Sequence, residues 1–79
     1  MSISKTMMAF LKAEKEAGGN PTIAEVAKHL DMSRTSTRDQ LLICVEKGLL
    51  EYTRGRSPSF SFTEGGRRTV IEGVTWRSA

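Results

Sequence analysis

Apolar residues recur at helical spacing in three stretches of the chain, and two short stretches after them alternate apolar and polar positions. The helical spacing predicts amphipathic helices over residues 3–17, 22–30 and 33–47. Alternation around a central turn predicts a β-hairpin over residues 49–63, and a last helix is predicted over 64–77. The chain is therefore expected to have an α+β fold that is mainly α.

The second and third helices are joined by a tight turn. Thr22 and Glu25 are spaced as a capping box, in which hydroxyl and carboxylate oxygens satisfy backbone N–H groups at the helix start. The turn falls at Asp31, Ser33 caps the next helix, and Gly48 ends it. The positions predicted to face the core are Ile23, Val26, Ala27 and Leu30 on one helix, and Thr37, Leu41, Cys44 and Val45 on the other.

The outer elements supply the rest of the predicted core. Residues 55–58 have the composition of a turn, and Phe60 and Phe62 lie on one face of the second strand. We expect both rings to pack on the helices rather than to stack on nucleic-acid bases. Thr63 is a candidate cap for the last helix. The remaining predicted core positions are Ile3, Met7, Phe10, Leu11 and Ala17 on the first helix and Val70, Ile71 and Val74 on the last.

The length and charge of the chain limit its domain organisation and its binding partners. Seventy-nine residues form one small domain, and a single cysteine excludes an internal disulfide and a cysteine-based metal site within one chain. The net charge is +3, and residues 1–53 hold equal numbers of basic and acidic side chains, so the whole excess lies in residues 54–79. That excess is arginine, which suits phosphate and guanine contacts. A solvated basic tail is the alternative explanation.

The sequence resembles the winged helix-turn-helix DNA-binding domains of bacterial and phage transcriptional regulators. The stretches that carry the resemblance are TIAEVAKHLDMSRTSTRDQL and EKGLLEY, followed by SFTEGGRR, which is similar to the wing of MarR-like regulators. The resemblance covers nearly the whole chain and extends loosely to small fimbrial-operon regulators. It implies a three-helix core, a β-hairpin wing and a C-terminal helix.

The resemblance implies that the helix over 33–47 enters the major groove while the wing lies on the DNA backbone or in the minor groove. Arg38 is suited to a bidentate contact with guanine, whereas Asp39 would accept from cytosine or hold Arg38 in position. Arginines near the wing tip favour a narrow minor groove. The expected DNA-binding residues are Ser33, Arg34, Thr35, Ser36, Arg38, Asp39, Arg54, Arg56 and Ser57.

Three positions depart from the family pattern. Asp31 replaces the glycine of the turn and must adopt a left-handed backbone, and Thr37 takes an apolar position, from which its hydroxyl can bond back to a helix carbonyl. Leu42 and Ile43 stand where polar residues are usual, which indicates a contact surface. With Trp76, they are the expected interface with the C-terminal helix, a second copy in a homodimer, or another protein.

Other functions are less consistent with the sequence. An enzyme is not expected, because His29 has no residue placed to form a nucleophile–base pair with it and no glycine-rich loop follows a strand. The sequence indicates no cofactor, metal, small-molecule ligand or membrane segment, and the expected location is cytoplasmic. Two alternatives stay open: a winged-helix protein-interaction module of a larger assembly, and a DNA-architectural protein such as an excisionase or plasmid control protein.

Overall fold

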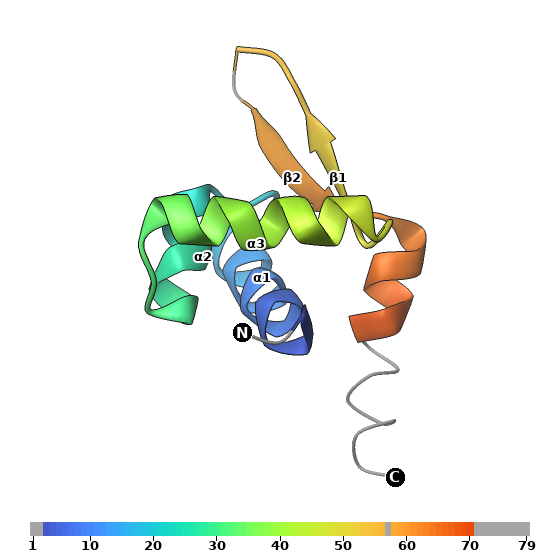
Figure 1. Ribbon diagram of the computed structural model, residues 1–79, viewed down its shortest axis with the longest axis horizontal. Helices are drawn as coiled ribbons and strands as arrows, with labels where there is room; N and C mark the ends of the chain where they lie inside the picture. Colours follow the sequence, from blue (N-terminus) through green and yellow to red (C-terminus); the bar gives the residue numbers. More distant parts are fainter. Residues whose placement is uncertain (1–2, 57, 71–79) are drawn as a thin grey trace, which may run out of the picture.

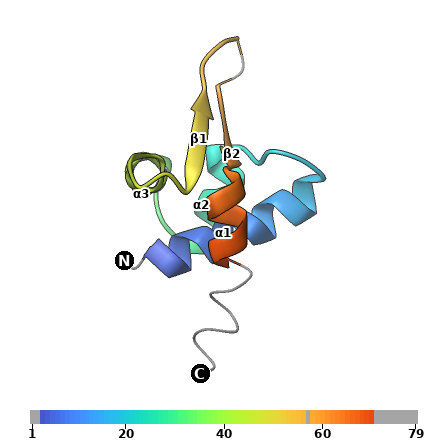
Figure 2. The same cartoon turned by 90° about the vertical axis from the view of Figure 1, so that its right-hand side faces the viewer.

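The computed structural model describes residues 3–56 and 58–70, in which three helices are followed by a projecting β-hairpin (Figures 1 and 2). The elements are α1 (Ile3–Ala17), α2 (Ile23–Leu30), α3 (Arg34–Glu46), β1 (Leu50–Thr53) and β2 (Ser59–Phe62). A further helical segment covers residues 64–70, and the rest of the helix predicted over 64–77 lies outside the described residues. The predicted mainly helical winged-helix fold is confirmed.

Helix α1 crosses beneath α2 and α3 and contributes the largest share of the core. Phe10 is fully buried, and Met7, Ala9 and Ala13 surround it on the same face. Ala17 was predicted to join this face but is exposed, because the last turn of α1 extends past the core. The core cluster consists of Met7, Ala9, Phe10, Ala13, Val26, Leu30, Leu41, Cys44, Leu50, Phe60 and Val70.

Local hydrogen bonds set the ends of α2. The Thr22 N–H donates to the Glu25 carboxylate at 2.8 Å, and the Glu25 N–H donates to the Thr22 hydroxyl at 3.1 Å, so the predicted capping box is present. Asp31 ends the helix with φ 54° and ψ 47°, the left-handed conformation expected of it. Asparagine and aspartate adopt this conformation more readily than most residues, so the turn forms without glycine.

Helix α3 buries one narrow stripe, which partly buried residues flank, and exposes its opposite face. Ser33 accepts a hydrogen bond from the Ser36 N–H, and the Thr37 hydroxyl donates to the Ser33 carbonyl at 2.8 Å, as predicted for both residues. Thr37, Leu41 and Cys44 are fully buried. Val45, predicted to belong to this stripe, is only partly buried because it lies at the edge of the contact.

The two strands pair in antiparallel register, with Leu50 opposite Phe62 and Tyr52 opposite Phe60. Phe60 is buried, and the Phe62 ring meets the Phe10 ring edge-on at 5.0 Å. Both phenylalanines therefore pack on the protein as expected. The base of the hairpin is joined to the core, while residues 54–56 lie at its distal end (Figure 1).

A compact junction joins the end of α3, the base of the wing and the helix over 64–70. The Thr63 hydroxyl donates to the Gly48 carbonyl at 2.7 Å and accepts from the Gly66 N–H at 2.9 Å, so Thr63 caps the helix as predicted. The Thr63 N–H also donates to the Leu49 carbonyl at 3.2 Å. Gly66 is buried against Leu49, where the backbones approach too closely for a side chain.

Candidate nucleic-acid interface

The exposed face of α3 is the direct consequence of its buried stripe. Because Thr37, Leu41 and Cys44 point inward, the positions between them point outward. Every predicted contact residue on this helix is exposed, as is its N-cap: Ser33, Arg34, Thr35, Ser36, Arg38 and Asp39. The Ser33 oxygen is engaged with the Ser36 N–H, so its hydroxyl caps the helix in addition to any contact it makes.

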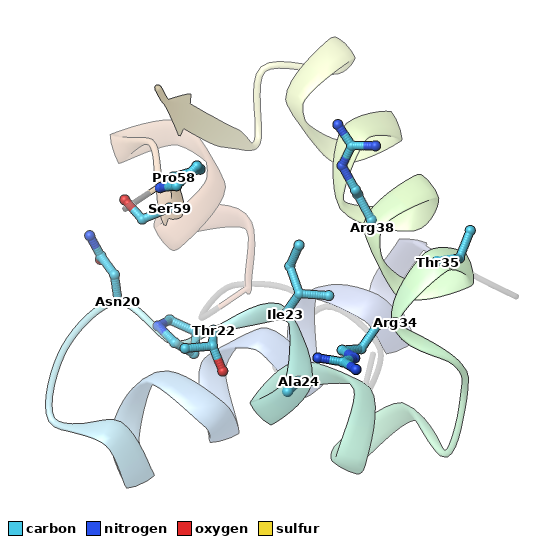
Figure 3. Close-up of a pocket in the computed structure, with 10 residues that line it drawn as sticks. Asn20, Thr22, Ile23, Ala24, Arg34, Thr35, Arg38, Pro58 and Ser59 are labelled. Carbon is cyan, nitrogen blue, oxygen red and sulfur yellow. The ribbon is translucent and has the colours of Figure 1, made fainter. Parts of the chain in front are cut away.

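A groove of about 490 Å³ lies between this face and the start of β2, which is the end of the strand nearer the wing tip (Figure 3). Arg34, Thr35 and Arg38 line it from α3, and Pro58 and Ser59 line it from the wing. The start of α2 and the preceding turn complete the lining, with Asn20, Pro21, Thr22, Ile23 and Ala24. Three segments far apart in sequence thus form one concave surface that carries two arginines.

The start of α2, and Pro58 and Ser59 of the wing, were not among the predicted contact residues. The signal available in the sequence was the capping box itself, because it fixes where a helix begins and hence where free backbone N–H groups lie. The hydrogen bond from the Thr22 N–H, with a further one involving the Thr22 side chain, lowers the pKa of Glu25 below its ordinary value. Glu25 is therefore ionised at neutral pH and holds this edge of the groove in place.

Arg54 and Arg56 lie at the distal end of the hairpin and are exposed. Gly55 between them has φ 154°, a backbone conformation that favours glycine, so the chain reverses there without strain. The end of the hairpin that carries both residues projects beyond the body of the domain (Figure 1). Ser57, the third predicted contact residue of the wing, lies outside the described residues.

The arginines of the described residues divide into two groups by their partners. Arg67 donates to the Glu14 carboxylate at 2.7 Å, and Arg68 lies 3.5 Å from the Glu64 carboxylate. Within residues 3–56 and 58–70, no acidic side chain pairs with Arg34, Arg38, Arg54 or Arg56. Asp39 therefore does not hold Arg38 here. Of the described arginines in the basic C-terminal part, those of the wing are therefore unpaired, and those of the helix over 64–70 are paired.

Leu42 and Ile43, the two members of the predicted interface on α3, differ in exposure. Leu42 was predicted to be exposed beside Ile43, but it is partly buried and packs against the core cluster. Ile43 remains 37% exposed, the one large hydrophobic side chain of the described residues that is classed as exposed. Trp76, the third member of the predicted interface, lies outside the described residues.

The remaining chemically notable side chains have structural partners. His29 Nε2 lies 2.8 Å from the Glu16 carboxylate, linking α2 to the end of α1. Cys44 is buried, and burial raises the pKa of its thiol, while the charge of Lys47 acts in the opposite direction. No cluster of histidine, cysteine and carboxylate side chains within the described ranges is arranged to hold a metal ion. Among the helices of those same ranges, none combines the length and apolar character needed to cross a membrane.

No protein-family model and no curated protein matches the sequence, whereas solved structures match it over most of its length. BpsR of Bordetella bronchiseptica, whose DNA binding is regulated by 6-hydroxynicotinic acid, superposes with a TM-score of 0.73 at 18% identity, covering 96% of this chain and 53% of BpsR. A MarR family transcriptional regulator from Silicibacter pomeroyi gives 0.73 at 19% identity, covering 94% and 50%. ZitR of Lactococcus lactis gives 0.68 at 24%, covering 91% and 49%.

These likenesses identify the fold as the winged helix of MarR-family transcriptional regulators, the family whose wing the sequence resembles. The chain spans about half the length of these proteins.

Proposed function

We propose that this chain binds double-stranded DNA in a sequence-specific manner and regulates transcription of a prokaryotic or phage operon. The observation that carries the proposal is the division of the arginines. Among the described residues, the paired Arg67 and Arg68 lie on the helix over 64–70, whereas the unpaired arginines lie on α3 and the wing. Unpaired guanidinium groups are fully available to phosphates and guanine edges.

In the proposed complex, the N-terminal half of α3 enters the major groove. Arg38 makes a bidentate contact with guanine, and the hydroxyls of Thr35 and Ser36 donate to phosphate oxygens. Asp39 accepts from a cytosine amino group. The groove between α3 and Pro58 and Ser59 of the wing receives the sugar–phosphate backbone, while Arg54 and Arg56 follow the adjacent backbone or minor groove.

One copy of the domain presents a single recognition helix, which reads few base pairs. Specific binding at physiological salt usually requires a larger surface, so we propose that a symmetric homodimer reads two half-sites. Selection of binding sites from random duplexes tests this proposal. Two inverted half-sites with centres separated by roughly 10 base pairs, or a multiple of that spacing, are the expected result. A single unrepeated site would contradict the dimer.

The DNA contacts are tested with the double variant Arg38→Ala/Arg56→Ala. Both side chains are exposed, so the fold should be retained while affinity for the selected duplex is lost. The slope of log K against log salt should become shallower by about 1 to 2 for the residual binding. For each contact that is lost, formation of the complex releases about one counterion fewer from the DNA.

The matched control is Lys12→Ala/Lys15→Ala, which removes the same charge from exposed positions of α1 away from the groove. It should leave affinity within about threefold of the wild type, because distant surface charges are largely screened at 0.15 M salt. Equal losses in the two double variants would indicate a non-specific charge effect. Unchanged retention of DNA by the arginine variant at moderate salt would refute direct DNA binding.

A further inference from the structure

Four side chains, referred to below as the Arg67 cluster, lie beside the base of the wing. Phe10 and Glu14 lie one turn apart on α1, Phe62 ends β2, and Arg67 lies on the helix over 64–70. The rings of Phe10 and Phe62 meet edge-on at 5.0 Å, and the Arg67 guanidinium carbon lies 4.9 Å from the centre of the Phe62 ring. Nη2 of Arg67 lies 2.7 Å from Glu14 Oε2, and this ion pair completes the Arg67 cluster.

We propose that Arg67 is a positioning residue for the wing, which it holds against α1 through Phe62 and Glu14. The inference rests on the proposed function, because a fixed wing direction matters only if the wing contacts DNA. Two paired strands of four residues are marginally stable alone, so the direction of the wing depends on contacts at its base. Phe62 is held between Phe10 on α1 and the guanidinium group of Arg67.

The two halves of the Arg67 contact reinforce each other. The Glu14 side chain is only 16% exposed, so the ion pair is more sheltered from solvent than a typical surface pair. A guanidinium group over an aromatic face and bonded to a carboxylate has little freedom to leave either partner. The pair joins residues 53 positions apart and thereby ties the segment after the wing to the first helix.

A direct phosphate contact by Arg67 would have the opposite consequence for Glu14. If Arg67 bound DNA, then Glu14→Gln would remove a competing negative charge, and binding would become tighter. If Arg67 positions the wing, the same substitution loosens the Arg67 cluster, and DNA binding becomes weaker. The sign of the change in affinity therefore separates the two roles.

The test measures DNA affinity of Glu14→Gln, Arg67→Gln and the double variant by fluorescence anisotropy on the selected duplex. We expect each single variant to bind about three- to tenfold more weakly, because the affinity falls with the fraction of molecules whose wing is correctly placed. The double variant should be no weaker than the weaker single variant, since both substitutions break one contact. The slope of log K against log salt should stay unchanged for Glu14→Gln.

The matched control is Glu64→Gln, which removes the same charge from the exposed ion pair with Arg68 on the same helical segment. This variant should bind DNA as tightly as the wild type or slightly more tightly. Arg67→Lys should recover part of the affinity, because lysine keeps the charge over the Phe62 ring and the pairing with Glu14. Wild-type or tighter binding by Glu14→Gln would overturn the positioning role.

A second measurement keeps the inference distinct from the proposed function. Amide NMR spectra of the free protein should show shifts and faster hydrogen exchange along β1 and β2 in Glu14→Gln, and no such changes in Glu64→Gln. Unchanged amide shifts and exchange rates along the wing in Glu14→Gln would overturn the role of the Arg67 cluster in positioning the wing, whether or not the protein binds DNA. Absence of DNA binding by the wild type, together with altered wing amides, would refute only the proposed function.

Discussion

Substitution of Gly66 by alanine tests whether the junction between α3, the wing and the following helix is as close as the structure shows. A Cβ built at this position overlaps the Leu49 carbonyl oxygen and lies 2.7 Å from its carbonyl carbon. The obstacle is backbone, so no side chain can rotate away. The Leu49 carbonyl also accepts a hydrogen bond from the Thr63 N–H, and the Thr63 hydroxyl donates to the Gly48 carbonyl. A shift of the Leu49 backbone therefore strains both hydrogen bonds.

The expected loss follows from these contacts. Overpacking of a close contact costs about 1–3 kcal/mol, and each of the two weakened hydrogen bonds costs up to about 1 kcal/mol. Alanine in a helix offsets up to about 1 kcal/mol relative to glycine. We therefore expect Gly66→Ala to lower the free energy of unfolding by about 2 kcal/mol. For a domain of this size, that corresponds to a fall in Tm of about 8–16 °C.

Urea denaturation followed by far-UV circular dichroism measures this loss, with Gly65→Ala as the control. A Cβ at Gly65 meets only the Thr63 hydroxyl oxygen at 4.0 Å, so alanine there should leave stability unchanged or raise it by up to about 1 kcal/mol. The two variants differ by one position on the same helix and by about 3 kcal/mol in expected stability. Equal stability of the two would refute the close approach to Leu49.

Three further predictions concern the core and the start of α2. Leu41→Ala should lower the free energy of unfolding by about 2–5 kcal/mol in the same assay, because the side chain is fully buried, and a loss below about 1 kcal/mol would contradict that burial. The Cys44 thiol should react with a thiol reagent at a rate that follows protein unfolding, because burial both covers it and raises its pKa; rapid labelling of the folded protein would argue against this packing. Because the pKa of Glu25 is lowered in the folded state, its contribution to stability is present above its unfolded value of 4.5 and is lost as pH falls through the folded value. The stability difference between wild type and Glu25→Ala, measured from pH 7 down to about pH 2, should therefore shrink as pH falls below 4.5, and a constant difference would contradict the capping role.

Most features predicted correctly from the sequence depend on contacts between residues that are close along the chain. The capping box at Thr22 and the bond from Thr37 to Ser33 span three and four positions, respectively, and the left-handed Asp31 ends its own helix. Hydrophobic spacing likewise indicated which faces of the helices are buried. Such contacts can be predicted from the sequence alone because the chain already holds the interacting atoms near one another.

The candidate site was predicted in part for the same reason. Once Thr37 and Leu41 are assigned to the core, helical geometry places Arg34 and Arg38 on the opposite surface. The groove they line could not be predicted, because its other walls come from the start of α2 and from Pro58 and Ser59. Which segments face one another depends on helix packing and the direction of the wing.

Only the tertiary structure decided which charges and apolar groups are already occupied. The sequence placed Arg67 in a basic C-terminal stretch, but the fold pairs it with Glu14 and Phe62. The sequence likewise marked Leu42 as exposed, whereas neighbouring core residues cover part of it. Helical spacing gives the direction in which a side chain points, whereas its partners depend on how distant elements pack. The sequence thus determined the elements and the exposed arginines of α3, and packing between distant segments determined that, among the described arginines, only those of α3 and the wing are unpaired.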